Sequence, residues 1–308
     1  MTTRHSRALG AALAAALAAV TLSACSPSPA SAGGRIVAVG AENEYADVLS
    51  QIGGRFVSVS AVMSNPNADP HTFESNTEVA QLVSSAALVV QNGAGYDDFM
   101  TRIEQASPSS SRKVIVVQAL LGLGSATPNP HLWYAPTTMP KVAAAVAADL
   151  GRLEPAHKAY FQANLRRFDR SLRPWLSEIA TIKAKYPGAK VATTEPVADY
   201  LIQAAGLVNA TPFPFQADVM NGVDPAPQDV SLEQSLLARR EVRVFVYNKQ
   251  VTDSLTQSLL AIAGRHHVPV VGVYETMPRP GYDYQSWMLA EAKALLDALE
   301  HGRSAPSL

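Results

Sequence analysis

Cysteine is almost absent from this chain of 308 residues, which contains only Cys25. A single cysteine cannot form a disulfide within the chain. Charge of one sign is not in excess either, since the formal net charge is −1. Nucleic acid and anionic membrane surfaces attract strongly basic proteins, so the charge gives no support for either as a partner. Glycine and proline are not enriched, which argues against wholesale disorder.

The first 25 residues have the pattern of a bacterial secretory signal. Arg4 and Arg7 precede an Ala, Leu and Val run that is short for a stable membrane span. The sequence LSAC at 22–25 then matches the lipobox, in which the peptide is cut before the cysteine and the thiol is lipidated. We therefore predict a lipoprotein signal peptide over 1–25, lipidation of Cys25 and a flexible tether over 26–34. The alternative is an ordinary signal peptide with an incidental cysteine.

The rest of the chain alternates short apolar runs, which predict buried strands, with helical patterns. Hydrophobic residues make up 47% of the chain, which is enough for two cores of ordinary domain size. Strands that alternate with helices predict an α/β fold with mostly parallel sheets. We place an N-terminal lobe at 35–153 and a C-terminal lobe at 188–302, and we expect a loop broken by prolines over 211–227.

Between these lobes, residues 154–187 predict one long amphipathic helix. At 1.5 Å per residue, its roughly thirty residues would reach about 45–50 Å. We interpret it as a rigid connection between the lobes, with the ligand site in a cleft between them. Pro174 removes a backbone donor near its middle and predicts a kink. The apolar stripe recurs every three or four residues and consists of Phe161, Leu165, Phe168, Leu172, Trp175, Ile179 and Ile182.

Four side chains with metal-binding chemistry follow predicted strands: His71 and His131 in the first lobe, Glu195 and Glu275 in the second. Ligand sites of parallel sheets lie beyond the carboxyl ends of the strands, so these side chains would meet if the lobes face each other. Imidazole suits zinc, copper, iron and nickel, whereas carboxylate moves the preference toward harder ions such as manganese. Two carboxylates would also neutralise a divalent ion. No compact spacing such as His-x-x-x-His supports the site.

Each candidate also has a purely structural interpretation. The histidines can be loop residues bonded to the backbone, and Glu275 can be an exposed loop charge. Glu195 can cap a helix expected over 196–205. His266 and His267 are adjacent, and neighbours in a helix point about 100° apart, so we assign both to the solvated surface.

Four short motifs resemble one protein family. They are DPHTFE at 69–74, NPHLW at 129–133, YNKQ at 247–250 and ETMP at 275–278. They are similar to the metal-binding solute-binding lipoproteins of bacterial ABC importers, some of which are described as adhesins. The resemblance covers residues 33–300, and it implies two Rossmann-like lobes joined by a rigid helix, with four metal ligands between them.

Carried over by motif, the resemblance implies that His71, His131, Glu195 and Glu275 bind the metal. The third ligand position of the family, matched by Glu195, is His in many zinc binders and Glu in many manganese binders. Aspartate is usual at the fourth ligand position, and Glu275 lies a little further past its strand than that aspartate would. The His-rich loop of many zinc members is missing, and Ala135 stands where an aspartate is common. Two carboxylates that each chelate with both oxygens would approach the six-coordination that manganese accepts.

The resemblance implies a transport function and not an enzyme. We expect a monomer, lipid-anchored on the extracytoplasmic side of the cell membrane, that captures Zn²⁺ or Mn²⁺ and delivers it to an ABC permease. A protein of the same rigid-helix class that binds a siderophore or corrinoid is an alternative, although acidic cleft residues would repel ferric siderophore anions. A zinc hydrolase is another, but four protein ligands would leave no open position for water.

Overall fold

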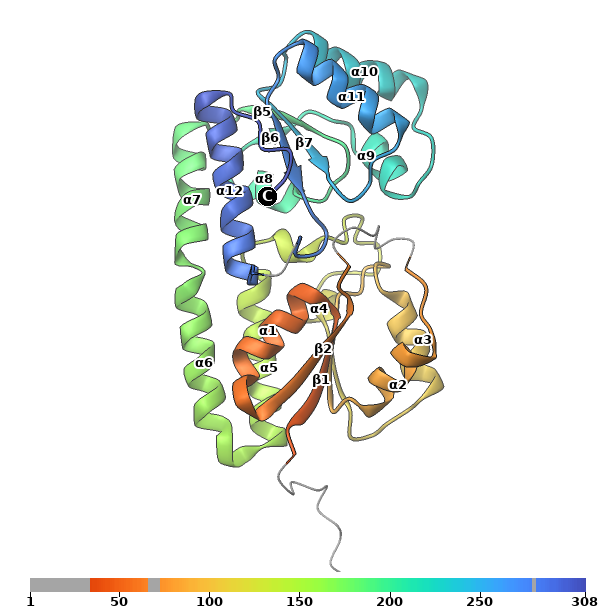
Figure 1. Ribbon diagram of the computed structural model, residues 1–308, viewed down its shortest axis with the longest axis vertical. Coiled ribbons are helices and arrows are strands. Elements are labelled where there is room, and N and C mark those ends of the chain that lie inside the picture. Colours follow the sequence, from red (N-terminus) through yellow and green to blue (C-terminus); the bar gives the residue numbers. More distant parts are fainter. Residues whose placement is uncertain (1–33, 66–72, 279–280) are drawn as a thin grey trace, which may run out of the picture. The chain divides into compact units, whose positions relative to one another are not determined.

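Two four-stranded parallel sheets organise the chain (Figure 1). The computed structural model describes residues 34–65, 73–278 and 281–308, and residues 35–308 pack together as one unit. The strand orders are β2-β1-β3-β4 and β6-β5-β7-β8, with parallel pairing between all neighbouring strands. The predicted α/β class with mostly parallel sheets in two lobes is therefore confirmed.

The first sheet forms the N-terminal lobe, and its central strand β1 is apolar because both of its edges and faces are covered. In register, Val39 of β1 pairs with Ser60 on one side and Val89 on the other. The strands are β1 (Ile36–Glu42), β2 (Val57–Met63), β3 (Leu88–Gln91) and β4 (Lys113–Val116). The helices are α1 (Asn43–Gly53), η1 (Gly54–Phe56), α2 (Thr77–Ser85), α3 (Asp98–Ala106), α4 (Val117–Leu120), η3 (Leu132–Tyr134) and α5 (Thr138–Leu153).

The second sheet forms the C-terminal lobe and differs from the prediction at two places. The expected loop over 211–227 contains a helix, α9, because Pro214 falls in its first turn, where a missing N–H costs nothing. The helix expected from 196 begins only at Asp199, after a turn. The strands are β5 (Lys190–Thr193), β6 (Val208–Asn209), β7 (Val244–Asn248) and β8 (Val270–Val273). The helices are α8 (Asp199–Ala204), α9 (Phe213–Met220), α10 (Pro227–Ala238), α11 (Ser254–Arg265) and α12 (Tyr284–His301).

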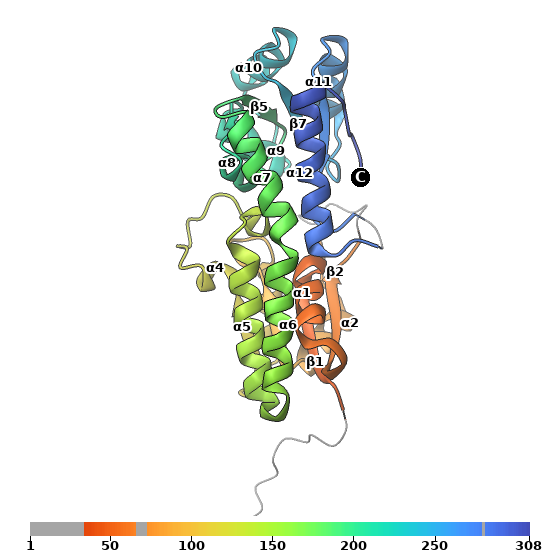
Figure 2. The ribbon, with the colours of Figure 1, turned by 90° about the vertical axis from the view of Figure 1, so that its left-hand side faces the viewer.

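The connection between the lobes is two helices and not the predicted single one. After the short turn η4 (Pro155–His157), α6 (Lys158–Ser171) and α7 (Arg173–Lys185) are separated at Leu172. The interruption lies where Pro174 has no N–H to donate to the preceding turn. Figure 2 shows α7 continuing upward from α6, and α12 packs along α7. The predicted stripe is buried except for Leu165, which is half-buried, whereas the lobe boundaries stay predictions.

A buried carboxyl group on α12 helps to fasten the two lobes together. Glu291 is 1% exposed, and its Oε1 accepts from Trp287 Nε1 at 2.8 Å and from the Tyr274 N–H at 3.2 Å. The Tyr134 hydroxyl lies 2.7 Å from both Glu291 Oε2 and the Tyr274 carbonyl oxygen. One hydroxyl proton cannot serve two acceptors, so a proton on Glu291 completes the network. Burial accordingly raises the pKa of Glu291 to about 8.

We predict that Glu291→Gln flattens the pH dependence of the unfolding free energy of the metal-free protein. The ordinary carboxyl pKa of 4.5 is raised to about 8 on folding. The stabilisation that the protonated Glu291 carboxyl gives to the folded state is therefore complete below pH 4.5 and is lost as pH rises through 8. The reason is that, in this range, the carboxyl ionises freely only in the unfolded state. The loss should be on the order of a few kcal/mol at about 1.4 kcal/mol per pKa unit.

Urea unfolding of native protein and variant across this pH range measures the difference. The control is Glu300→Gln, which changes an exposed carboxyl near the end of the same helix. Lys185 lowers the pKa of Glu300, so this variant should keep the native slope between pH 4.5 and 8. If the curves of Glu291→Gln and the native protein run parallel, the carboxyl is not protonated in the folded state.

Candidate metal site

Three neighbouring strands of the second sheet place polar groups side by side at their carboxyl ends. Glu195 follows β5, Asn248 ends β7, and Glu275 follows β8, and these strands are adjacent and parallel. All three side chains are at most 2% exposed. The interpretation of Glu275 as an exposed loop charge is therefore wrong. Glu195 does not cap α8 either, because that helix begins after Ala198 without a side-chain cap.

His131 is presented from the N-terminal lobe by the loop between α4 and η3. The Asn92 side chain, just after β3, donates to the Pro130 carbonyl oxygen at 2.8 Å and so fixes this loop to the sheet. Asn129 gives its amide N–H to the Pro196 carbonyl oxygen at 2.7 Å, which turns Oδ1 toward the imidazole. That Oδ1 lies 2.9 Å from His131 Nδ1 and accepts its proton. Nε2 is thereby directed into the site, where its lone pair can accept a proton or a metal ion.

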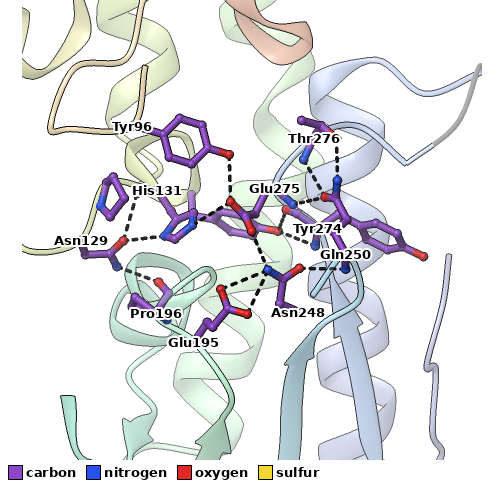
Figure 3. A network of polar contacts seen from close by, with 12 residues as sticks. Tyr96, Asn129, His131, Glu195, Pro196, Asn248, Gln250, Tyr274, Glu275 and Thr276 are labelled. Carbon is purple, nitrogen blue, oxygen red and sulfur yellow. Dashed lines mark hydrogen bonds and ion pairs between the residues drawn. The ribbon is translucent and has the colours of Figure 1, made fainter. Parts of the chain in front are cut away.

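His131 and Glu275 come into direct contact across the lobes, as Figure 3 shows. His131 Nε2 lies 3.3 Å from Glu275 Oε2, and both side chains are fully buried. The Tyr96 hydroxyl donates to the same Oε2 at 2.9 Å. A nitrogen lone pair and a carboxylate oxygen that face each other can share a proton or a metal ion, and binding of the metal then displaces the proton.

Asn248 joins the two carboxylates of the site. Its amide nitrogen donates to Glu275 Oε1 at 2.5 Å and lies 3.2 Å from each oxygen of Glu195. Gln250, two residues further on, accepts the backbone N–H groups of Glu275 and Thr276 at 2.6 and 3.0 Å. Side chains and backbone around Glu275 are thus held by the same short segment (Figure 3).

Two of the predicted residues lie outside the described residues: His71 and the lipidation candidate Cys25. In the part of the chain that the structure describes, no three His, Cys, Asp or Glu side chains are close enough to hold one metal ion. The structure therefore brings together His131, Glu275 and, through Asn248, Glu195, and their ligand roles stay predictions. His266 and His267 are half-buried and exposed at the end of α11, as predicted for surface residues.

A group of buried acids beside the site was missed by the sequence argument. Glu42 ends β1, Glu44 follows it at the start of α1, and both are fully buried, while Asp97 lies after β3. Burial raises the pKa of both Glu42 and Glu44 well above the usual range. The charge of Asp97 adds to the rise at Glu42, and the charge of Glu275 adds to the rise at Glu44. Burial likewise raises the pKa of Asp97 to about 6. The signal was available, because the position after a strand end applies to β1 and β3 as well.

The donor set fits a divalent transition metal. An imidazole nitrogen with its other nitrogen tied to an amide oxygen is the usual arrangement of a histidine ligand. Two buried carboxylates supply the negative charge that a 2+ ion requires in a buried site. Nitrogen and oxygen donors together suit zinc, manganese, iron or nickel, and the described residues contain no cysteine that would favour softer ions.

Known proteins with similar sequence or structure bind metal ions. The curated Manganese-binding lipoprotein MntA of Bacillus subtilis is 24% identical over 137 residues, which are 42% of this chain and 44% of that protein. The chain thus matches less than half of the length of that relative. The SBP FpvC of P. aeruginosa, solved in complex with Ni²⁺, has a TM-score of 0.71 and 22% identity, covering 88% of this chain and 99% of that one.

A Cd-bound periplasmic metal binding protein from candidatus Liberibacter asiaticus has a TM-score of 0.70 at 16% identity, covering 86% of this chain and all of that one. At these identities the structures show the fold, which agrees with the two sheets described above. Residues 39–298, most of the chain, match the family described as zinc-uptake complex component A, periplasmic. The chain belongs to this family of extracytoplasmic metal-binding transport proteins, which confirms the resemblance found in its motifs.

Proposed function

We propose that this protein captures a divalent transition metal ion, Zn²⁺ or Mn²⁺, and delivers it to an ABC permease. The observation that carries the proposal is the contact between His131 and Glu275, two buried donors that come from different lobes. The family match supports transport as the purpose of the site. A siderophore or corrinoid pocket is not favoured, because the centre of this site is occupied by closely packed carboxylates.

The proposed ligands are His131, Glu195, Glu275 and His71. His131 Nε2 and Glu275 Oε2 already face each other, and Glu195 lies on the other side of the Asn248 amide. His71 is included because the DPHTFE motif at 69–74 matches the family position. By the Irving–Williams order, Zn²⁺ binds such a site more tightly than Mn²⁺ at equilibrium. Manganese can still be the physiological cargo if it is the more available ion.

We predict that Glu195→Gln weakens both Zn²⁺ and Mn²⁺ binding at least about tenfold, or 1.4 kcal/mol. The substitution keeps the shape of the side chain but removes a negative charge from a buried site that binds a cation. Glu195→His should instead move the preference toward zinc, because imidazole is the softer ligand. Calorimetric titration of the purified protein with each metal measures both effects.

The matched control is Glu233→Gln, which removes an equally buried carboxyl from α10 in the same lobe. It should leave both affinities at the native level. Unchanged binding in Glu195→Gln would remove Glu195 from the proposed ligand set, and absence of stoichiometric binding in the native protein would refute the function.

We propose further that Cys25 anchors the mature protein in the outer leaflet of the cell membrane. The support is the lipobox at 22–25, the lipoprotein name of the Bacillus relative and the extracytoplasmic family. Among the described residues, no helix is both long and apolar enough to cross a membrane. A single acyl chain binds a membrane weakly, so stable attachment needs more than one.

We expect Cys25→Ala to be released into the medium or to stay unprocessed, because the lipidated thiol is lost. Cell fractionation combined with mass spectrometry of the N-terminus measures both outcomes. Ser26→Ala, one residue further on, should remain in the membrane fraction like the native protein. A processed Cys25→Ala that still fractionates fully with membranes would contradict the anchor.

A further inference from the structure

The orientation of the Asn248 side chain is fixed by the backbone N–H of Gln250, two residues further on. Its Oδ1 accepts the Gln250 N–H at 3.0 Å, and its backbone N–H donates to Thr194 Oγ1 at 3.0 Å. The amide group cannot turn over without losing the first of these bonds. The NH₂ end is therefore directed at the carboxylates, 2.5 Å from Glu275 Oε1 and 3.2 Å from each oxygen of Glu195.

This amide makes the two oxygens of Glu275 unequal. Oε1 accepts from Asn248, whereas Oε2 accepts from Tyr96 and faces His131 Nε2. The Gln250 side chain also holds the backbone N–H of Glu275, so the residue is fixed at both ends. A metal ion bound to His131 Nε2 thus meets one oxygen of Glu275, while the other is occupied by a hydrogen bond to Asn248.

Resting on the proposed function, we propose that Asn248 is a selectivity-determining positioning residue. It restricts Glu275 to coordination through one oxygen and so favours a metal of low coordination number, zinc, over manganese. Zinc is satisfied by four ligands in a tetrahedron, whereas manganese prefers about six oxygen-rich positions. Chelation by both oxygens of each carboxylate, which would favour manganese, is prevented at Glu275 as long as the amide is present.

The test compares Asn248→Ser with Gln250→Ala in competitive titrations with Zn²⁺ and Mn²⁺. A serine hydroxyl can still accept the backbone N–H of residue 250 but does not reach the carboxylates, so the turn is kept and the hydrogen bond to Glu275 is removed. We expect the ratio of zinc to manganese affinity to fall about tenfold or more in this variant. Gln250→Ala should lower both affinities by a similar factor and leave the ratio near the native value.

Co²⁺ provides a second readout that a general loss of structure would not imitate. Four-coordinate Co²⁺ absorbs visible light much more strongly than six-coordinate Co²⁺, so the visible band of the loaded protein should weaken in Asn248→Ser and persist in Gln250→Ala. Asn248→Ala is measured alongside, with thermal unfolding of each metal-free variant, so that the test does not depend on one substitution.

The proposal is overturned if the ratio of zinc to manganese affinity stays within about threefold of the native ratio in both Asn248 variants. It is also overturned if Gln250→Ala shifts this ratio as much as the Asn248 variants do. Native protein that binds neither metal overturns the proposed function as well, which distinguishes the two failures.

Discussion

The constraint on which the site depends is the burial of two carboxylates next to each other. Glu195 and Glu275 are at most 2% exposed, and taking such groups from water is costly unless hydrogen bonds or a cation compensate them. The protein supplies the Asn248 amide and the Tyr96 hydroxyl as donors to these carboxylates, and the Gln250 side chain holds the backbone of Glu275 by accepting its N–H. These donors are neutral, so a divalent cation bound as proposed would balance the charge of the two carboxylates.

The order of the strands is what makes this arrangement possible. The site strands are far apart in sequence, yet the order β6-β5-β7-β8 sets their carboxyl ends beside one another. The same rule operates in the other lobe, where β1, β3 and β4 lead to Glu44, Tyr96 and His131. A parallel sheet thus collects polar groups from distant segments at one edge, while the apolar strands behind them remain buried.

This rule explains which parts the sequence could predict. The α/β class and the meeting of His131 with the Glu275 segment follow from apolar runs that end in polar residues. Asn248 stands out in the sequence only as part of the motif at 247–250, because an amide carries no metal-binding signal of its own and its role depends on which strands are neighbours. The helix α9 was missed because prolines normally break helices, whereas here Pro212 is the N-cap and Pro214 lies in the first turn. The division of 154–187 at Leu172 follows from Pro174. The sequence could not show that the interruption would be limited to one residue between α6 and α7.

Hydrogen bonds between the lobes indicate that much of the site is formed before a metal arrives. Asn129 donates to the Pro196 carbonyl oxygen beside Glu195, and Tyr284 Oη on α12 donates to the Trp133 carbonyl oxygen at 2.6 Å. Tyr134 reaches the Tyr274 carbonyl oxygen next to Glu275. Each bond ties a segment next to a proposed ligand to the other lobe, so these segments would lose little conformational freedom on metal binding. Affinity is gained when ordering costs are met during folding and not during binding. The free-energy cost falls instead on the metal-free protein, which must keep two buried carboxylates close together. The Asn248 amide reduces this cost because it donates hydrogen bonds to both.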